Sequence, residues 1–333
     1  MPSLRELGEF EVLRRLAAAR EAPAGTIVDS GDDAAVLRTD PDRELVVTTD
    51  AFVEGRHYPT GRRAAAAIGE RLALANLSDL AAMAAEPRWA LLSMGVRSEH
   101  DADELVLLQA GVARALSSEG AGLVGGNLTA VEGAEWFSLT LLGQVERGRA
   151  WSRAGARPGD LMGVTGSPGR AAAGLRLLRA GDDAGARADL KPVIDAWRSP
   201  ACRVRAARTL AASGVVTAAI DISDGFAGDL ARLCAASGVG AEVDAAAWPD
   251  DPALDRAAVV LGVTVGALRF GPGDDYELLL AVDPSVDTAS LRSAGVTLIG
   301  RFTGAPSELT QREPGGNVRT LPRGGFDHFA AEV

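Results

Sequence analysis

The chain has few residues of the kinds that build disulfide frameworks, zinc sites or phosphate-binding loops. It contains only two cysteines, Cys202 and Cys234, and neither belongs to a CxxC pair or lies beside a histidine cluster, which argues against a disulfide framework or a zinc site. This cysteine content is typical of a reducing cytoplasm. The only lysine, Lys191, precedes a proline, so the chain has no GxxxxGK[ST] loop.

Long apolar runs and basic clusters are also missing. No stretch reaches the roughly 18 uncharged apolar residues of a membrane span, and the N-terminal segment lacks the apolar region of a signal peptide. The net charge of −11 argues against nucleic acid as a partner, because phosphate backbones are held by Lys and Arg. GxSxG and protein-kinase signatures are absent too. We therefore expect a cytoplasmic protein that has no membrane span and whose main partner is not nucleic acid.

The apolar content is sufficient for more than one core. Hydrophobic residues make up 47% of the 333 residues and charged residues 24%, which is ordinary for a globular chain of more than one domain. A hydrophilic segment rich in Gly, Arg and Pro, residues 146–160, interrupts the pattern of elements. We expect two domains, residues 1–148 and 149–333.

Hydrophobic periodicity indicates the elements of each half. In the first half it predicts helices over 4–19, 62–87 and 101–118, and strands over 44–50, 89–96 and 136–145. In the second half it predicts strands over 161–166 and up to Asp221, helices over 171–180, over 199–213 and from Asp224, and a strand-turn motif over 270–282. This mixed order favours an α+β fold over a doubly wound parallel sheet.

Asp79 occupies a position where a carboxylate is costly. It follows Ile68, Leu72 and Ala75 at steps of four, three and four, so it projects from the apolar stripe of the expected helix. A buried carboxylate needs a partner or a metal ion. The alternative interpretation is a cap or a partly exposed acid on an alanine-rich face.

Two more segments place acids where strands meet loops. Thr48 and Asp50 share one face at the C-terminal end of a strand, a place where sites often lie. The sequence DSGDD, residues 29–33, adds three acids around a glycine, although the same pattern is typical of a turn.

The stretch AAIDISDGFAGDL puts Asp221, Ser223 and Asp224 where an apolar strand runs into a helix. Backbone N–H groups and the helix dipole favour phosphate at such a junction. Alternatively, Ser223 or Asp224 is only a helix N-cap.

Together these acids indicate a magnesium site. Mg²⁺ prefers hard oxygen ligands and commonly takes one or two carboxylates with substrate phosphates and water. Calcium is disfavoured, because the sequence has no EF-hand loop. Metal ions bridging carboxylate and phosphate would let an acidic protein bind ATP.

The motifs GDDAAVL, TTDAFVEGRHY, NLSDLAAMAAEP, RAGARPGD, DISDGFAGDL, GPGDDYELL and FDHF follow one another over nearly the whole chain. In this order they resemble the thiamine-monophosphate kinase family, of the aminoimidazole ribonucleotide synthetase superfamily. The resemblance implies an N-terminal domain that binds ATP and Mg²⁺ and dimerises through its sheet. It also implies an α+β C-terminal domain that completes the active site, and phosphorylation of thiamine monophosphate to thiamine diphosphate.

Position by position, the resemblance implies functional roles for residues in both halves. The metal-binding set is Asp32 or Asp33, Thr48, Thr49, Asp50, Asp79, Asn127, Asp221 and Asp224. The nucleotide-contacting set is Gly126, Asn127, Ser223 and Arg153, with Arg153 near the ATP phosphates. His57, Glu277 and Phe326 match positions that hold the thiamine end, although Phe326 is alternatively a packing residue. Asp50, Asp224 and Arg153 are the residues expected to be catalytic.

Two departures from the family pattern affect these expectations. The chain reads GGNLT where the family has GGDTT or GGDL, so Asn127 replaces a metal-binding aspartate. An amide oxygen still ligates Mg²⁺ but adds no charge, and we expect weaker binding of one ion or lower turnover. TGSPG, residues 165–169, stands in for the family's TGTLG.

The implied mechanism is in-line transfer of the γ-phosphoryl group of ATP to a substrate phosphate oxygen. A phosphate monoester has a second pKa of about 6, so the nucleophile needs no strong general base. Repulsion between two anions is then the main barrier, which metal ions and Arg153 would lower. Two alternatives stay open. One is another ATP-using enzyme of the superfamily that activates an amide or formyl oxygen, and the other is a homologue that binds ATP or thiamine phosphate without turnover.

Overall fold

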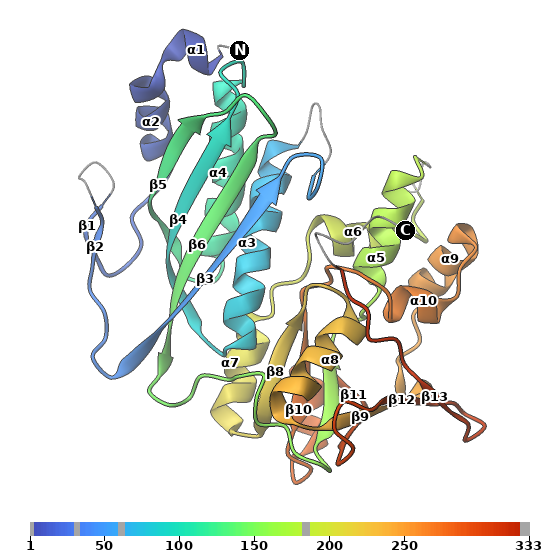
Figure 1. Cartoon of the computed structure of the whole chain (residues 1–333). Coiled ribbons are helices and arrows are strands. Elements are labelled where there is room, and N and C mark those ends of the chain that lie inside the picture. The colour runs from blue at the N-terminus through green and yellow to red at the C-terminus, as the bar shows by residue number, and fades with distance from the viewer. Residues whose placement is uncertain (1–2, 30–33, 59–63, 182–186, 327–333) are drawn as a thin grey trace. The chain divides into compact units, whose positions relative to one another are not determined.

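The computed structural model describes residues 3–29, 34–58, 64–181 and 187–326 and divides into two compact units (Figure 1). Unit 1 comprises Met1–Leu80 and Ala85–Ala150, and unit 2 comprises Ala81–Ala84 and Trp151–Val333. Each unit has its own sheet and its own buried residues. In the described part of the chain, no helix is long and apolar enough to cross a membrane.

Unit 1 is built on a four-stranded sheet in the order β3-β6-β4-β5, with α3 and α4 against one face (Figure 1). Its helices are α1 (Leu4–Leu7), α2 (Glu9–Ala18), α3 (Ala65–Ala82) and α4 (Ala102–Ser117). The sheet strands are β3 (Arg43–Val53), β4 (Glu86–Val96), β5 (Gly122–Ala130) and β6 (Trp136–Glu146), and a separate pair is β1 (Thr26–Val28) with β2 (Val36–Leu37).

Strand β3 separates its two faces by simple alternation. Even-numbered residues from Val46 to Phe52 are buried or half-buried, whereas odd-numbered residues from Leu45 to Ala51 are exposed. Thr48 and Asp50 therefore share the less exposed face, as a period of two predicts. The open face carries apolar side chains, including Leu45 and Val47.

Unit 2 contains a seven-stranded sheet in the order β13-β12-β9-β11-β7-β10-β8. The strands are β7 (Leu161–Thr165), β8 (Val216–Ile222), β9 (Gly240–Asp244), β10 (Glu277–Val282), β11 (Val296–Thr303), β12 (Leu309–Arg312) and β13 (Val318–Thr320). Its helices are α5 (Arg170–Arg179), α6 (Lys191–Arg198), α7 (Val204–Ser213), α8 (Phe226–Ser237), the 3-10 turn η2 (Ala245–Ala247), α9 (Pro252–Leu261), α10 (Val265–Arg269) and α11 (Thr288–Ser293). Neighbouring strands are antiparallel except for the parallel pair β9 and β12, and the expected α+β class is confirmed.

Unit 2 has two hydrophobic clusters. One lies between the sheet and α8, where Phe226 contacts Trp248 and Phe270 edge-on. The other joins α5, α6, α9 and α10 through buried side chains such as Leu177 and Leu254 (Figure 1). The first cluster fixes the end of β8 and the start of α8, where the acidic motif lies.

The clearest differences from the expected elements lie in unit 1. The helix expected over 4–19 is two helices, separated at Gly8, whose φ is 76°. The helix expected over 62–87 ends at Ala82, and Pro87 lies instead near the start of β4, beside a register irregularity that tolerates its missing N–H. Strand β5, for which the sequence predicted no element, forms by pairing with β4 along its length.

Candidate active site

In unit 1, an oxygen-rich group joins β3 to α3. The Thr48 hydroxyl donates a hydrogen bond to Asp79 Oδ2 at 2.5 Å, and Asp50 lies two residues further along the same face of β3. Asp79 is in the body of α3 and half-buried, so it is not a helix cap. Thr48 and Asp79 are therefore in direct contact, and a metal-binding role for the pair stays a prediction.

Thr49 faces the other side of the sheet. Its hydroxyl donates to the Leu139 carbonyl at 3.2 Å and accepts a bond from the Thr140 hydroxyl at 3.1 Å. It does not join the Thr48 and Asp79 side chains, and a metal-binding role for Thr49 stays a prediction.

His57 lies in a tight turn that follows β3. The backbone N–H of Val53 donates to His57 Nδ1 at 3.0 Å, and the imidazole stacks on Phe52 with ring centroids 5.4 Å apart. Because Nδ1 accepts this bond, the ring proton is on Nε2. The turn thus holds the half-buried His57 ring in the tautomer that carries its proton on Nε2.

Gly126 and Asn127 line a cavity in unit 1. The cavity has a volume of about 1110 Å³ and lies among α2, β2, β4 and β5, with Leu16, Leu92 and Leu123 in its wall. A Cβ atom on Gly126 would lie 1.9 Å from the Leu92 carbonyl oxygen, so only glycine permits this approach of β5 to β4. Asn127 is exposed and is paired in register with Ser93.

In unit 2, the acidic motif follows the end of β8. Asp221 is 3% exposed within the strand. Ser223 and Asp224 come after the strand, and the N-cap of α8 is Gly225 rather than either of them. The capping alternative is therefore wrong for both residues.

Asp229, which the sequence interpretation did not select, holds this turn in place. Its Oδ2 accepts the backbone N–H groups of Ser223 and Asp224, both at 3.1 Å, and its Oδ1 accepts Arg232 Nη1 at 2.5 Å. The same Arg232 nitrogen lies 2.6 Å from Asp224 Oδ2. Burial raises the pKa of Asp229, against the lowering effect of these hydrogen bonds. The sequence signal that could have identified Asp229 is an acid among the apolar residues of the first turn of α8.

The carboxylate of Glu277 accepts hydrogen bonds from side chains within unit 2. It is 8% exposed, and its carboxylate accepts bonds from Thr165 Oγ1 at 2.5 Å and from two nitrogens of Arg203, each at 2.5 Å. Arg203, another residue that the sequence interpretation missed, lies just before α7. A contact of Glu277 with the thiamine end of a substrate stays a prediction.

The segment that departs from the family pattern, TGSPG at residues 165–169, is held together with the start of α5 by two buried aspartates. Asp275 accepts the backbone N–H groups of Gly169 and Ala171, both at 2.8 Å. Asp251 accepts Ser167 Oγ at 2.5 Å and forms a bidentate pair with Arg170. Burial raises the pKa of Asp275 to about 7, although the two N–H groups act in the opposite direction.

Phe326 and Arg153 are exposed in unit 2. The backbone N–H of Phe326 donates to the Asp224 carbonyl at 2.9 Å, which brings the C-terminal segment back to the acidic turn. The Arg153 carbonyl accepts Ser237 Oγ at 2.8 Å. Asp32 and Asp33 lie outside the described residues.

The candidate metal ligands are distributed over both units. Within the described ranges, no three His, Cys, Asp or Glu side chains come close enough to hold a metal ion. Thr48, Asp50 and Asp79 lie in unit 1, and Asp221 and Asp224 lie in unit 2. These hard oxygen donors fit Mg²⁺, which takes one or two carboxylates and completes its shell with phosphates and water.

Comparison with known proteins identifies the family. Residues 31–145 match "AIR synthase related protein, N-terminal domain", and residues 157–309 match the corresponding C-terminal domain. A thiamine-monophosphate kinase of Synechococcus elongatus is 34% identical over 334 residues, which cover 98% of each chain. The chain belongs to the thiamine-monophosphate kinase family. The resemblance inferred from the motifs is thus confirmed.

Solved structures of this family have the same fold. The crystal structure of thiamine-monophosphate kinase from Stenotrophomonas maltophilia K279a aligns with a TM-score of 0.80 and 32% identity, covering 92% of this chain and 97% of that one. A structure of AaThiL complexed with AMPPCP and TMP aligns with a TM-score of 0.77 and 26% identity, covering 99% of both chains. Membership of the family therefore extends over both units.

Proposed function

We propose that the chain transfers the γ-phosphoryl group of ATP to thiamine monophosphate and forms thiamine diphosphate. The observation that carries this proposal is the nearly complete alignment with a relative whose structure contains AMPPCP and TMP. AMPPCP is a stable analogue of ATP. The identity of 34% to a thiamine-monophosphate kinase over 98% of both chains supports the same reaction.

We assign ATP and Mg²⁺ binding to residues 1–148 and completion of the active site to residues 149–333. The cavity beside Gly126 and Asn127 supports a nucleotide site in the first domain. Asp50, Asp79, Asp221 and Asp224 would hold Mg²⁺, with an oxygen of Asn127 as a further ligand. When bound, Mg²⁺ would neutralise phosphate charge.

The chain's own residues orient the reactants and lower their repulsion. The substrate phosphate oxygen is largely ionised at neutral pH, because the second pKa of a phosphate monoester is about 6, so no side chain need remove a proton. Arg153 would neutralise charge on the ATP phosphates. His57 donates from Nε2, because its Nδ1 is engaged by the Val53 N–H, and acts in binding rather than as a phosphorylated intermediate.

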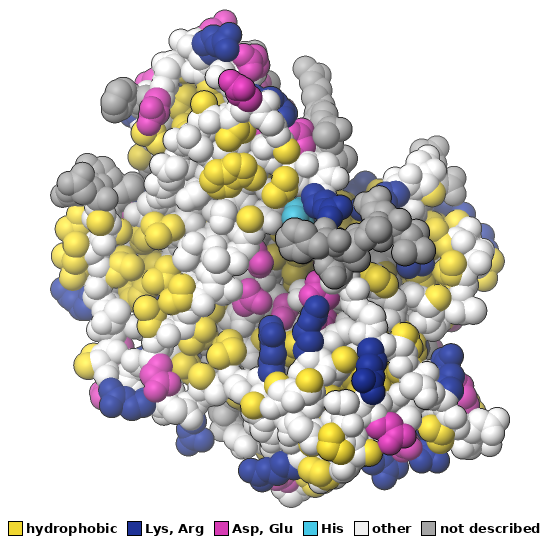
Figure 2. All heavy atoms as spheres, in the orientation of Figure 1, with side chains coloured by type: hydrophobic (Ala, Val, Ile, Leu, Met, Phe, Trp, Pro, Cys, Tyr) yellow, Lys and Arg dark blue, Asp and Glu magenta, His cyan; other side chains and the backbone are white. Residues whose placement is uncertain are grey.

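We also propose a cytoplasmic homodimer that forms through the sheet of unit 1. The open face of this sheet carries the exposed side chains Leu45, Val47 and Leu91. Figure 2 shows hydrophobic side chains in yellow over this sheet, in the left half of the view. Exposed apolar patches of this kind mark protein interfaces.

A direct assay tests the reaction. The protein is incubated with ATP, Mg²⁺ and thiamine monophosphate, and the expected products are thiamine diphosphate and ADP in equal amounts. Binding of either substrate in calorimetry without product would support the non-catalytic homologue instead. ADP formation only with an amide- or formyl-bearing acceptor would support the other branch of the superfamily.

Two substitutions test the metal ligands. Asp50→Asn and Asp224→Asn should each lower turnover by about 100-fold or more, because each removes a charge that holds cations at the transferring phosphate. Both variants should keep a near-normal melting temperature. Asp195→Asn, which changes an exposed carboxylate paired with Lys191, is the matched control and should leave turnover unchanged. Near-normal rates in both test variants would refute the assignment.

A further inference from the structure

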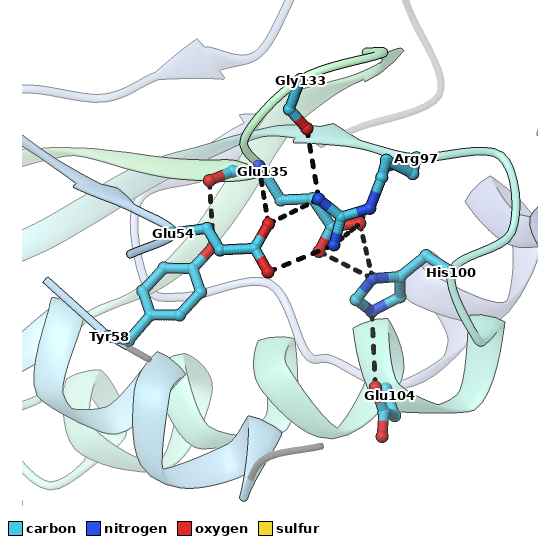
Figure 3. Close-up of polar contacts among 7 residues, drawn as sticks. All are labelled: Glu54, Tyr58, Arg97, His100, Glu104, Gly133 and Glu135. Atoms are coloured by element: carbon cyan, nitrogen blue, oxygen red, sulfur yellow. Dashed lines mark hydrogen bonds and ion pairs between the residues drawn. The ribbon is translucent and has the colours of Figure 1, made fainter. Parts of the chain in front are cut away.

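A cluster of charged side chains lies at one end of the sheet in unit 1 (Figure 3). We name it the Glu135 cluster, and it consists of Glu54, Arg97, His100 and Glu135. Glu54 follows β3, Arg97 and His100 follow β4, and Glu135 precedes β6. Glu135 is only 1% exposed. None of these residues is among the proposed metal or nucleotide contacts, although Glu54 lies in the same motif as Asp50 and His57.

The two carboxylates of the cluster are satisfied by neighbours on the β4 side. Arg97 contacts both oxygens of Glu54, at 2.5 and 3.2 Å, and its backbone N–H donates to Glu135 Oε1 at 3.0 Å. His100 Nδ1 lies 3.0 Å from both oxygens of Glu135. Burial alone would raise the pKa of Glu135, but the bonds from His100 and Arg97 outweigh it and lower the pKa. Glu135 is therefore ionised at neutral pH.

The backbone of Glu135 connects the cluster to both ends of the turn that carries His57. Its carbonyl accepts the backbone N–H of Glu54 at 2.8 Å and the Tyr58 hydroxyl at 3.1 Å, and its N–H donates to Glu54 Oε2 at 3.2 Å. Figure 3 shows Glu54 and Tyr58 converging on Glu135 from the same side. Glu54 and Tyr58, at the two ends of the turn, are thus both hydrogen-bonded to Glu135, which lies in the connection between β5 and β6.

His57 lies inside this turn, and its ring position depends on the turn's geometry. The turn is closed by the Gly55 N–H to the Tyr58 carbonyl at 2.7 Å and by the His57 N–H to the Val53 carbonyl at 3.0 Å. The ring itself is fixed by the Val53 N–H and by Phe52. A shift at either end of the turn therefore moves the imidazole.

We propose that Glu135, Arg97 and Tyr58 are positioning residues for His57 and thereby set the affinity for thiamine monophosphate. The proposal rests on the role of His57 at the thiamine end in the proposed function. Burying the carboxylates of Glu54 and Glu135 in an ion cluster adds little net stability compared with apolar packing, so stability alone accounts poorly for these ionisable groups, although the Arg97 side chain is 40% exposed. The hydrogen bonds from this cluster reach both ends of the turn that carries His57. Fixing the geometry of that turn is therefore a better explanation for the charged groups.

Steady-state kinetics of Glu135→Gln and Tyr58→Phe test the proposal. Glu135→Gln keeps the side-chain volume but weakens the contacts with Arg97 and His100, and Tyr58→Phe removes a single hydroxyl. Each should raise KM for thiamine monophosphate by roughly 5- to 50-fold, since networks of this kind couple by up to a few kcal/mol. KM for ATP and kcat should change less than about twofold. Glu104→Gln, at the partly exposed edge of the cluster 3.8 Å from His100 Nε2, is the control and should change nothing.

A double mutant separates this proposal from the proposed function. In a His57→Ala background, Tyr58→Phe should alter KM for thiamine monophosphate less than about twofold, because the positioned ring is gone. If His57→Ala raises this KM while Tyr58→Phe and Glu135→Gln do not, positioning is overturned and the role of His57 stands. If His57→Ala has no effect, that role and the positioning both fail.

The experiment gives an answer even if one variant does not fold or the wild-type protein shows no turnover. Should Glu135→Gln fail to fold, Tyr58→Phe decides the outcome by itself. Should the wild-type protein bind thiamine monophosphate without turnover, calorimetric Kd values replace KM in every comparison. Absence of any binding would overturn both proposals together.

Discussion

At the scale of single residues, Asn127 is the clearest departure from the family's metal-binding pattern. It lies exposed on β5, one residue after Gly126, in the wall of the cavity. An amide in place of a carboxylate removes one negative charge from the ligand set, and cation affinity depends on the number of charged ligands. The consequence is measurable as a change in Mg²⁺ requirement.

Asn127→Asp should lower the Mg²⁺ concentration that gives half-maximal activity by roughly 3- to 30-fold, because it restores a charged ligand. The measurement is a Mg²⁺ titration of the initial rate at saturating substrates. Asn317→Asp adds the same charge in an exposed turn of unit 2 and should leave the titration unchanged. An unaltered Mg²⁺ dependence in Asn127→Asp would mean that this position does not face the cation.

Asp275 makes the stability of unit 2 depend on pH. Its pKa in the folded protein is raised to about 7, whereas the ordinary value is 3.8. Its protonated form is therefore favoured by folding, so its contribution to stability is fully present below the ordinary pKa and is lost as pH rises towards 7.

Asp275→Asn should remove the pH-dependent contribution of this carboxyl group to the stability of unit 2. The free energy of unfolding of the wild-type protein should fall from pH 5 to pH 8 by on the order of 2 kcal/mol more than that of the variant. Denaturant unfolding of both proteins at the two pH values measures the difference. Parallel changes in the two proteins would contradict a raised pKa at this residue.

At the scale of elements, β5 depends on close packing against β4. The nine residues of β5 include three glycines, and local propensity alone does not favour a strand there. The register with β4, from Gly122 beside Trp89 to Ala130 beside Val96, determines the conformation. Helix α4, in contrast, begins and ends within a residue of its expected range because its periodicity and its Asp101 cap are local signals.

Gly126→Ala should destabilise unit 1 by about 1–3 kcal/mol and weaken ATP binding, because the new methyl group meets the backbone of β4. Thermal unfolding and nucleotide titration measure the two effects. Gly133→Ala is the matched control, since no atom lies within 4 Å of its added Cβ. Equal melting temperatures for the two variants would argue against the tight approach at Gly126.

At the scale of the whole molecule, the open face of the unit 1 sheet determines the proposed assembly. Val47 is 55% exposed in the middle of a strand whose other face packs against helices. A second copy covering this face would remove its apolar side chains from water, which is the usual driving force of association.

Val47→Glu should therefore convert the proposed dimer to monomer, since a charge buried in an apolar interface is costly. Sedimentation velocity gives the mass of each species. Val259→Glu changes a valine that is 71% exposed in α9 and should leave the proposed dimer intact. A wild-type protein that sediments as a monomer would disprove the proposed assembly.

Several properties of this protein follow from the sequence by itself. Family membership, the α+β class and the common face of Thr48 and Asp50 depend on the order of motifs and on the periods of strands and helices, which are local. The same holds for Asp79, whose spacing from Leu72 and Ala75 places it on the inner stripe of α3.

Only the tertiary structure decided which distant groups meet. Arg203 reaches Glu277 across 74 residues of sequence, and Glu135 joins a turn that begins 81 residues earlier. The structure also decided that α3 ends at Ala82, before Pro87. Ala84, in the turn that follows the helix, has a φ of 55°. The physical reason is that these contacts arise from strand register and packing between remote segments, which hydrophobic periodicity along the chain does not encode.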